Sequence, residues 1–274
     1  MFESILKNVH EKTPLVHCIT NYVTVNDVAN ILLACGGTPI MADDERDAVE
    51  ITAICDALVI NIGTLNERTI RTMLKTGKKA NELSHPVVLD PVGAGASTLR
   101  TDTTFKLLKE VKFAVVRGNI SEIKTIFKGS GTTKGVDADI SDYITDENID
   151  EAISLAKKLS AKIGSVIVAT GTIDIVADPN KAYIIRNGHQ LMSKISGTGC
   201  MLTAVIAAYC ASNPDKHLEA TAAAVCAFGL SGELAYEKTL KADAGISSFR
   251  TFLIDAVSKL DAKTLIGGMK IESR

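Results

Sequence analysis

The sequence predicts an α/β protein in which a mostly parallel central sheet is covered by helices on both faces. Short β-branched runs alternate with amphipathic stretches as far as Arg186, and this alternation is typical of a parallel sheet with helices on its faces. Beyond Gly197 the pattern changes to helices only. The composition agrees, because a chain without tryptophan and with 4% aromatic residues suits close packing of helices on such a sheet.

The elements are expected in a regular order along the chain. Strands are predicted at residues 15–19, 38–41, 57–62, 87–89, 114–116 and 165–169. Helical patterns occupy residues 25–33, 48–54, 67–83, 103–110, 200–211, 218–238 and 247–260. Two further short runs, 174–177 and 182–186, are joined by Asp178-Pro179-Asn180, and this turn predicts an antiparallel hairpin at the sheet edge.

The 274 residues are expected to form one domain, residues 1–274, since single α/β domains often reach this size. No low-complexity linker or internal repeat interrupts the chain. The most polar stretch, residues 129–150, is either a surface loop or a cover over a site, and an ordinary connecting loop would have the same composition. The fold class is therefore a three-layer arrangement in a single unit.

Charge and cysteine usage restrict the classes of partner. A net charge of −2, from 30 basic and 32 acidic residues without a block of one sign, gives no support to a nucleic-acid or membrane-surface role. Six cysteines without a C-x-x-C pair indicate reduced thiols in a cytosolic protein. We found no signal peptide and no run of about 18 apolar residues. These observations predict a cytoplasmic, soluble protein with a small ligand.

The segment Ser196-Gly197-Thr198-Gly199-Cys200 directly precedes an apolar helix. Glycines at this place let a ligand approach the backbone, and the free N–H groups of the first helical turn attract anions such as phosphate. The helix dipole there also favours a negative charge on the cysteine, as a proton acceptor or nucleophile. A glycine turn followed by a buried core cysteine is the alternative, and this motif alone does not exclude it.

Polar residues follow several predicted strands, and in open α/β sheets ligands bind beyond those strand ends. Asp90 precedes a glycine-rich loop, Arg117 is followed by Asn119 and Glu122, and Thr170 ends a further strand. Two carboxylates, an arginine and glycine loops fit a site for Mg²⁺ and nucleotide phosphate, because Mg²⁺ is usually held by one or two carboxylates together with substrate phosphates.

Each of these residues has a structural alternative. Asp90 could belong to a turn with Pro91, Asn119 could be a helix N-cap, and Glu122 its capping-box partner. Convergence of several strand ends favours phosphate chemistry over these separate explanations. The chain has neither a P-loop motif nor a G-x-G-x-x-G after its first strand. No two histidines have helical metal-ligand spacing, and only His17 is close to the expected pocket.

Taken together, the motifs resemble those of the hydroxyethylthiazole kinase family, within the ribokinase-like superfamily. The resemblance covers nearly the whole chain. Its motifs are LVHCITN (15–21), PIMA (39–42), NIGTL (61–65), LDPVGAGA (89–96), RGN (117–119) with Glu122, KGVD (134–137), ATG (169–171) and GTGC (197–200). It implies a ribokinase-like fold and transfer of the ATP γ-phosphate to the primary hydroxyl of 4-methyl-5-(2-hydroxyethyl)thiazole, a reaction of thiamine synthesis and salvage.

The resemblance also implies roles for particular residues. Those expected at the thiazole are Met41, Gly197, Asn21 and Val23. Those expected at ATP or in the anion hole are Arg117, Thr170, Asn119, Thr198 and Gly199. Asp90 and Glu122 would organise Mg²⁺ and phosphate. Cys200 stands where related sugar kinases have an aspartate base, and we expect it to act as a weak base or to orient the alcohol, since phosphoryl transfer depends mainly on positioning and charge stabilisation.

The family resemblance further implies a homotrimer with pockets at the subunit interfaces. Cys18 and the pair Asp43-Asp44 depart from the expected pattern, and the pair fits a solvated helix N-terminus. Two other functions stay open. The chain could be a non-catalytic protein that binds a nucleotide or vitamin precursor, and the cysteine in place of aspartate favours this alternative. It could also be a kinase for a different small alcohol.

Overall fold

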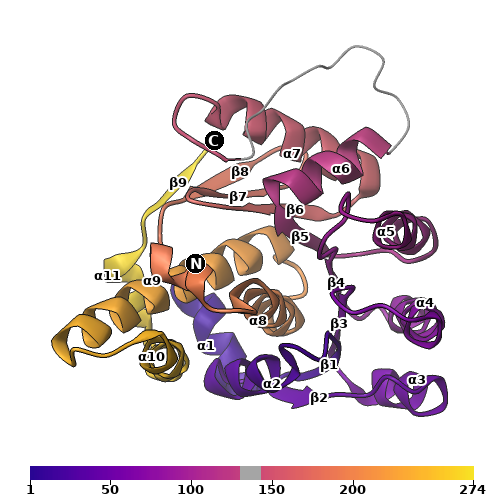
Figure 1. Cartoon of the computed structure of the whole chain (residues 1–274), viewed down its shortest axis with the longest axis horizontal. Coiled ribbons are helices and arrows are strands. Elements are labelled where there is room, and N and C mark those ends of the chain that lie inside the picture. Colours follow the sequence, from indigo (N-terminus) through magenta and orange to yellow (C-terminus); the bar gives the residue numbers. More distant parts are fainter. Residues whose placement is uncertain (130–142) are drawn as a thin grey trace.

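The computed structural model describes residues 1–129 and 143–274, and within them it contains one nine-stranded sheet (Figure 1). The strand order is β2-β1-β3-β4-β5-β6-β7-β8-β9. The strands are β1 (Leu15–Ile19), β2 (Thr38–Ile40), β3 (Ala57–Asn61), β4 (Val87–Asp90), β5 (Val115–Asn119), β6 (Val166–Thr170), β7 (Asp174–Ala177), β8 (Ala182–Ile185) and β9 (Ile271–Ser273). Pairing from β2 to β6 is parallel, and pairing from β6 to β9 is antiparallel.

Helices cover both faces of the sheet, as predicted (Figure 1). One face carries α3 (Glu45–Ile54), α4 (Glu67–Glu82), α5 (Thr98–Glu110), α6 (Ile120–Gly129) and α7 (Ile149–Ile163). The other carries α1 (Phe2–Lys12), α2 (Val25–Ala34), α8 (Thr198–Ser212), α9 (His217–Lys241), α10 (Ile246–Ser258) and α11 (Ala262–Gly268), with a 3₁₀ turn at Gln190–Lys194. The core is correspondingly split, because successive strand residues point to opposite faces. In β3, Val59 belongs to one apolar cluster and its neighbours Leu58 and Ile60 to the other.

Helix α8 is the element that positions the candidate site. It packs on β1, β3 and β4 and against α2 and α9, and every residue from Met201 to Cys210 is buried. A helix that is apolar on all sides belongs in the core of an α/β domain rather than on its surface. Its N-terminus consequently lies at the carboxyl ends of the strands that carry Asn61 and Asp90.

Helix α9 is long and apolar enough to cross a membrane by composition, but 83% of its most apolar window is buried inside the protein. Most of its apolar surface is already covered by α8, α10 and strands of the sheet. It is therefore a core helix by its packing.

The predicted strands agree with the structure to within three residues and the predicted helices to within five. The largest difference is α5, which begins at Thr98 because the Ser97 side chain caps it by accepting from Arg100 N. Four helices, α1, α6, α7 and α11, were not among the predicted helical ranges, although Asn119 was considered as the N-cap of a helix where α6 begins. The polar segment expected at 129–150 and the motif at 134–137 lie largely or wholly outside the described residues.

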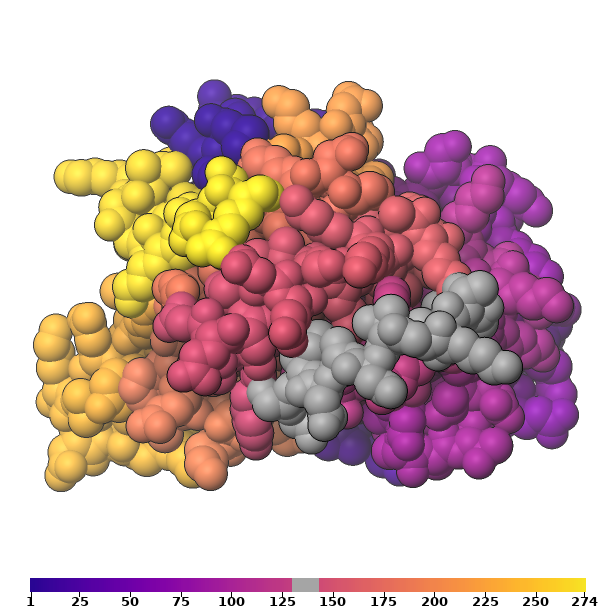
Figure 2. Space-filling model, turned by 90° about the horizontal axis from the view of Figure 1, so that it is seen from above, coloured from indigo at the N-terminus to yellow at the C-terminus, as the bar shows by residue number. Residues whose placement is uncertain are grey.

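Strand β9 corrects two sequence-based expectations. Residues beyond Gly197 do not form helices only, and the β7–β8 hairpin is not at the sheet edge, because β9 pairs with β8. Backbone bonds between Ala182 and Arg274 extend this pairing, and α11 packs on α1, so the C-terminal segment lies beside the N-terminal helix (Figure 2). Three residues are too few to show the alternation of a strand, so β9 could not be recognised from its residue pattern.

Candidate active site

The N-terminus of α8 presents free backbone N–H groups at the carboxyl edge of the sheet. Gly197 is the N-cap with φ of 91°, and a Cβ there would lie 2.5 Å from Thr24 Cγ2, so glycine is needed for both backbone and space. The helix begins at Thr198, two residues before the predicted start. Thr198, Gly199 and Cys200 thus form its first turn, whose N–H groups have no partner within the helix.

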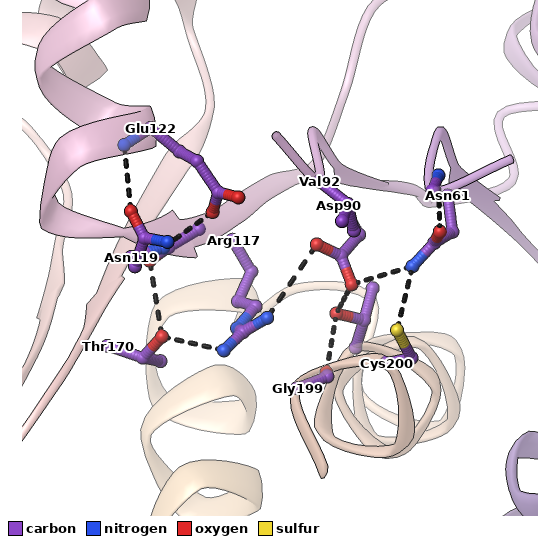
Figure 3. Close-up of polar contacts among 12 residues, drawn as sticks. Asn61, Asp90, Val92, Arg117, Asn119, Glu122, Thr170, Gly199 and Cys200 are labelled. Carbon is purple, nitrogen blue, oxygen red and sulfur yellow. Dashed lines mark hydrogen bonds and ion pairs between the residues drawn. The ribbon is translucent and has the colours of Figure 1, made fainter. Parts of the chain in front are cut away.

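Arg117, in β5, packs directly against this helix end. A Cβ on Gly199 would lie 2.4 Å from Arg117 Nη1, so the second glycine of the motif admits the guanidinium. Nη2 donates to Thr170 Oγ1 at 2.7 Å, and Nη1 lies 3.6 Å from Asp90 Oδ1 (Figure 3). The predicted convergence of β4, β5 and β6 on one site is therefore present in the structure. A guanidinium beside a helix N-terminus concentrates positive charge, which favours an anion.

Asp90 is fully buried at the end of β4. Its Oδ2 accepts from Asn61 Nδ2 and Thr203 Oγ1, each at 2.9 Å, whereas Oδ1 has no hydrogen-bond partner. Burial raises the pKa of Asp90 to about 6, although Arg117 opposes the rise. At neutral pH the group is mostly ionised, and one of its oxygens is left to interact with a ligand.

Glu122 and Asn119 form the reciprocal capping contacts that the sequence allowed as an alternative. Asn119 N donates to Glu122 Oε2 at 2.8 Å, and Glu122 N donates to Asn119 Oδ1 at 2.9 Å. Glu122 Oε1 also accepts from Gly93 N at 2.7 Å. Both carboxylate oxygens therefore bind backbone N–H groups and join the loop after β4 to the start of α6; Figure 3 shows the contacts between Glu122 and Asn119.

The Cys200 thiol lies between two carboxamides. Asn21 Nδ2 is 3.3 Å and Asn61 Nδ2 is 3.2 Å from its Sγ. Burial, and then the charge of Asp90, raise the pKa of Cys200 above its ordinary value, so the group is a neutral thiol at pH 7. The sequence suggested that the helix dipole favours a thiolate at this position, but burial and the charge of Asp90 favour the neutral form.

Sequence reasoning missed Asn61 and Thr203 as site residues. Asn61 closes the apolar strand β3, and the parallel register sets it beside Asp90. A buried amide at the end of an otherwise apolar strand was the available signal, because polar residues beyond strand ends line α/β sites. Thr203 gave no such signal within an apolar helix.

Two neighbouring hollows open beside this site. One, of about 220 Å³, is lined by Cys18, Thr20, Tyr22, Val25, Met41, Ala42, Asp43, Thr64, Asn66 and Thr69. The other, of about 470 Å³, is lined by Tyr22, Gly63, Thr64, Leu65, Asn66, Ser97, Leu99 and Arg100. Of the residues expected at the thiazole, Met41 lines the first hollow, and Asn21 contacts Cys200. Gly197 is the N-cap of α8, the helix that carries Cys200. Val23 is 61% exposed and lines neither hollow.

The segment after Met41 is fixed by buried and exposed contacts. The ring of His17 lies 2.8 Å from Ala42 O and 2.8 Å from Thr52 Oγ1. Asp44 caps α3 by accepting from Arg46 N, in agreement with the expected helix N-terminus. Asp43 pairs with Arg68 on α4 at 3.1 Å. The acidic pair therefore has a structural role, while Cys18 lines the hollow.

Within residues 1–129 and 143–274 no cluster of three or more acidic, histidine or cysteine side chains could hold a metal ion. Asp90 and Glu122 are the carboxylates of the site. A divalent ion at this place would thus depend on ligands from a bound phosphate, as is usual for Mg²⁺.

Known proteins resemble this chain over its whole length. The family model described as "Hydroxyethylthiazole kinase family" matches residues 6–263. The hydroxyethylthiazole kinase of Clostridium acetobutylicum is 59% identical over 273 residues, with all of both chains covered. That of Clostridium beijerinckii is 52% identical, covering 96% of this chain and 93% of its own.

Solved structures agree with this relationship. The hydroxyethylthiazole kinase protein of Pyrococcus horikoshii superposes with a TM-score of 0.89 at 35% identity, covering 100% of this chain and 98% of its own. The pyridoxal kinase of Staphylococcus aureus has a TM-score of 0.56 at 14% identity over 95% of this chain and 97% of its own, which supports the fold alone. The predicted ribokinase-like fold is confirmed, and the chain belongs to the hydroxyethylthiazole kinase family.

Proposed function

We propose that this protein transfers the γ-phosphoryl group of ATP to the primary hydroxyl of 4-methyl-5-(2-hydroxyethyl)thiazole, in thiamine synthesis and salvage. The observation that carries the proposal is the contact between the Arg117 guanidinium and the first turn of α8 at Gly199. Two sources of positive potential there face a buried carboxylate, which is the arrangement needed to hold and polarise a transferring phosphoryl group. Family membership supports the phosphotransferase class.

The chain's own residues would divide the reaction between them. Thr198, Gly199 and Cys200 supply N–H groups to the transferring phosphoryl group, and Arg117 with Thr170 binds ATP. The alcohol oxygen attacks the γ-phosphorus, the bond from this phosphorus to the bridging oxygen breaks, and ADP leaves. Cys200 orients the hydroxyl as a neutral thiol, or acts as a weak base through its minor thiolate form. The hydroxyl proton passes to that thiolate or to an oxygen of the transferred phosphoryl group, and it can leave late because a loose transition state gains mainly from positioning and charge stabilisation.

The thiazole ring would lie in the 220 Å³ hollow that Met41 lines, with Asn21 and Gly197 between it and the phosphoryl site, while Val23 is exposed outside this hollow. This volume is enough for a single substituted five-membered ring. The wall is mixed, with Met41, Val25 and Cys18 on its apolar side and threonines on its polar side, as small-molecule sites commonly are.

Mg²⁺ fits this site as a phosphate-dependent ion. The orphaned Oδ1 of Asp90 is a hard oxygen donor of the kind that Mg²⁺ prefers, and Glu122 adds negative charge nearby. Asn119 would act by holding Glu122 in place. When bound, the ion would neutralise charge on the ATP phosphates.

We also propose a cytoplasmic homotrimer of single-domain subunits, with the alcohol pocket completed by a neighbouring copy. The exposed apolar side chains around the two hollows support this: Tyr22 and Leu99, which line them, are 79% and 54% exposed, and Val23, next to Tyr22 in the chain, is 61% exposed. Large apolar side chains gathered beside a pocket are typical of a contact surface. Light scattering would test the assembly, and a monomer with full activity would contradict the shared pocket.

A coupled assay of ADP release tests the proposed reaction. The thiazole alcohol is compared with other primary alcohols at matched concentration, with and without Mg²⁺. Turnover restricted to the thiazole alcohol supports the proposal, whereas preference for another alcohol would reassign the substrate. The raised pKa of Cys200 favours a second candidate, a non-catalytic binding protein. ATP binding by calorimetry without ADP release from any alcohol would support that candidate.

A further inference from the structure

Asn61 has more polar contacts inside the site than its position in an apolar strand predicts. Its Oδ1 accepts from Gly63 N at 2.9 Å and from Asn21 Nδ2 at 3.0 Å. Its Nδ2 donates to Asp90 Oδ2 at 2.9 Å and to Cys200 Sγ at 3.2 Å. The side chain is 1% exposed, so all four contacts are shielded from water.

These contacts fix the orientation of the amide. If the amide were turned over, its NH₂ group would face the Gly63 N–H, and its oxygen would face the Asp90 carboxylate. Asn21 is fixed in the same way, because its Oδ1 accepts from Thr24 N at 3.1 Å. Both Asn21 and Asn61 must therefore direct N–H groups at Cys200 Sγ. Two amides whose orientations are both fixed by hydrogen bonds form a rigid network.

The network connects four separate parts of the chain. Asn21 follows β1, Asn61 ends β3, Asp90 ends β4, and Cys200 lies in the first turn of α8. Asn61 is the member that contacts the other three, and Figure 3 shows its contacts with Asp90 and Cys200. Its two amide hydrogens set the thiol and the carboxylate at fixed positions relative to each other.

We propose that Asn61 is a positioning residue for phosphoryl transfer. It holds the Cys200 thiol and the Asp90 carboxylate at fixed positions relative to each other and to the N–H groups in the first turn of α8. The inference rests on the proposed function for its catalytic consequence, but the position of the thiol is a property of the free protein. Aspartate at 61 would set a second carboxylate against Asp90. Alanine would leave the thiol and Asp90 Oδ2 each short of one donor. Only an amide of this length donates to both and accepts twice.

The experiment compares Asn61→Ala with Asn213→Ala. Asn213 is a suitable control because it is also buried and caps the opposite end of the same helix, with its amide bonded to Ile5 O and Tyr209 O. Both substitutions remove a buried amide and should lower the thermal midpoint. Steady-state kinetics are measured for both variants, each with Cys200 and with Cys200→Ala. Alkylation of Cys200 by iodoacetamide at one fixed pH is followed by peptide mass spectrometry, which is selective because the other five cysteines are buried.

We expect Asn61→Ala to lower kcat by about tenfold to about a hundredfold, the range that misplacement of reacting groups produces. The KM for ATP should stay unchanged. In the Cys200→Ala background the same substitution should have a smaller effect, because one of its two partners is already absent. Alkylation of Cys200 should become several times slower, since an N–H donor that favours the thiolate is lost. Asn213→Ala should change neither quantity.

An alkylation rate equal to that of the wild-type protein would overturn the inference, and so would kinetic losses that match those of Asn213→Ala. A wild-type protein without kinase activity, whose Asn61→Ala variant is nevertheless alkylated more slowly, would disprove the proposed function and leave the positioning of the thiol supported. If Asn61→Ala does not fold, Asn61→Ser, which keeps one hydroxyl donor, is measured in its place by the same criteria.

Discussion

Replacement of Gly199 by alanine tests the contact between α8 and Arg117. The added Cβ would lie 2.4 Å from Nη1 and 2.8 Å from Nη2. An ordinary contact begins at 3.4 Å, so the guanidinium has to move by about 1 Å, which separates it from Thr170 and from any bound phosphate. A charge-assisted hydrogen bond contributes about 1.5–3 kcal/mol, and its loss corresponds to about tenfold to 150-fold weaker ATP binding.

The stability of this variant should not fall with its affinity. Gly199 lies in the first turn of a helix, where alanine is favoured over glycine by up to about 1 kcal/mol. We therefore expect a raised apparent KM for ATP, with a thermal midpoint equal to or above that of the wild-type protein. Gly267→Ala is the matched control, because that helical glycine has no neighbouring atom within 4 Å.

Arg117→Ala should produce the same loss of ATP affinity, and the double variant should bind ATP no more weakly than Arg117→Ala alone. ATP titration by calorimetry and thermal unfolding of the four proteins provide the measurements. Unchanged ATP affinity in Gly199→Ala would refute the argument that the guanidinium is held by this helix end. Loss of stability in Arg117→Ala with intact ATP affinity would show that Arg117 holds the fold instead.

Three further predictions concern the carboxylates and the thiol. Glu122→Gln should lower kcat while leaving the KM for the thiazole alcohol unchanged. It should also lower the free energy of unfolding by about 1–3 kcal/mol, because the single oxygen of the amide cannot replace the two carboxylate oxygens that accept from Gly93 N and Asn119 N. An equal loss in kcat and in affinity for the alcohol would indicate that Glu122 only caps the helix. Cys200→Asp should keep or raise kcat near neutral pH, since Asn21 and Asn61 already direct N–H donors at this position, and Cys200→Ala should retain measurable activity. Initial rates of the three proteins across about pH 6 to 9 test both expectations. An inactive aspartate variant would count against a base or orienting role for Cys200. Asp90→Asn should become more stable relative to the wild-type protein as the pH rises from about 4 to about 6. The raised pKa of Asp90, about 6, means that its protonated form stabilises the folded wild-type protein, which loses up to about 3 kcal/mol of stability as the carboxyl ionises. Thermal midpoints of both proteins over this pH range test this, and a constant difference between them would show that Asp90 does not titrate there.

The sheet and most of its helices could be predicted from the sequence because both faces of the sheet are buried. Strands such as β3 are then continuous apolar runs, and the residues that break them, Asp90 and Thr170, mark the edge where the site lies. Strand β9 could not be predicted, since Ile271–Ser273 is paired only through tertiary contact with β8.

The residues that meet in the site could be predicted better than the hydrogen bonds between them. The sequence indicated that Arg117, Asp90 and Glu122 meet, and the structure brings together the ends of β4 and β5, which carry Asp90 and Arg117, and the start of α6, which carries Glu122 (Figure 3). It did not indicate that both oxygens of Glu122 bind backbone N–H groups, nor that Asn61 joins Asp90 to Cys200. Such contacts depend on the register between strands, which a single sequence does not encode locally.

The burial of α8 from Met201 to Cys210 separates the binding of the phosphoryl donor from the choice of acceptor, two properties that could otherwise change together. A helix whose body is enclosed by the core cannot tilt to suit a new ligand, so the proposed phosphoryl-binding end at Gly199 should stay constant while the protein diversifies. The hollow beside Met41 is built instead from loops and exposed side chains such as Tyr22. New acceptor specificity is therefore accessible to selection, or to a protein engineer, through substitutions in those loops that leave the phosphoryl donor and its chemistry unaltered.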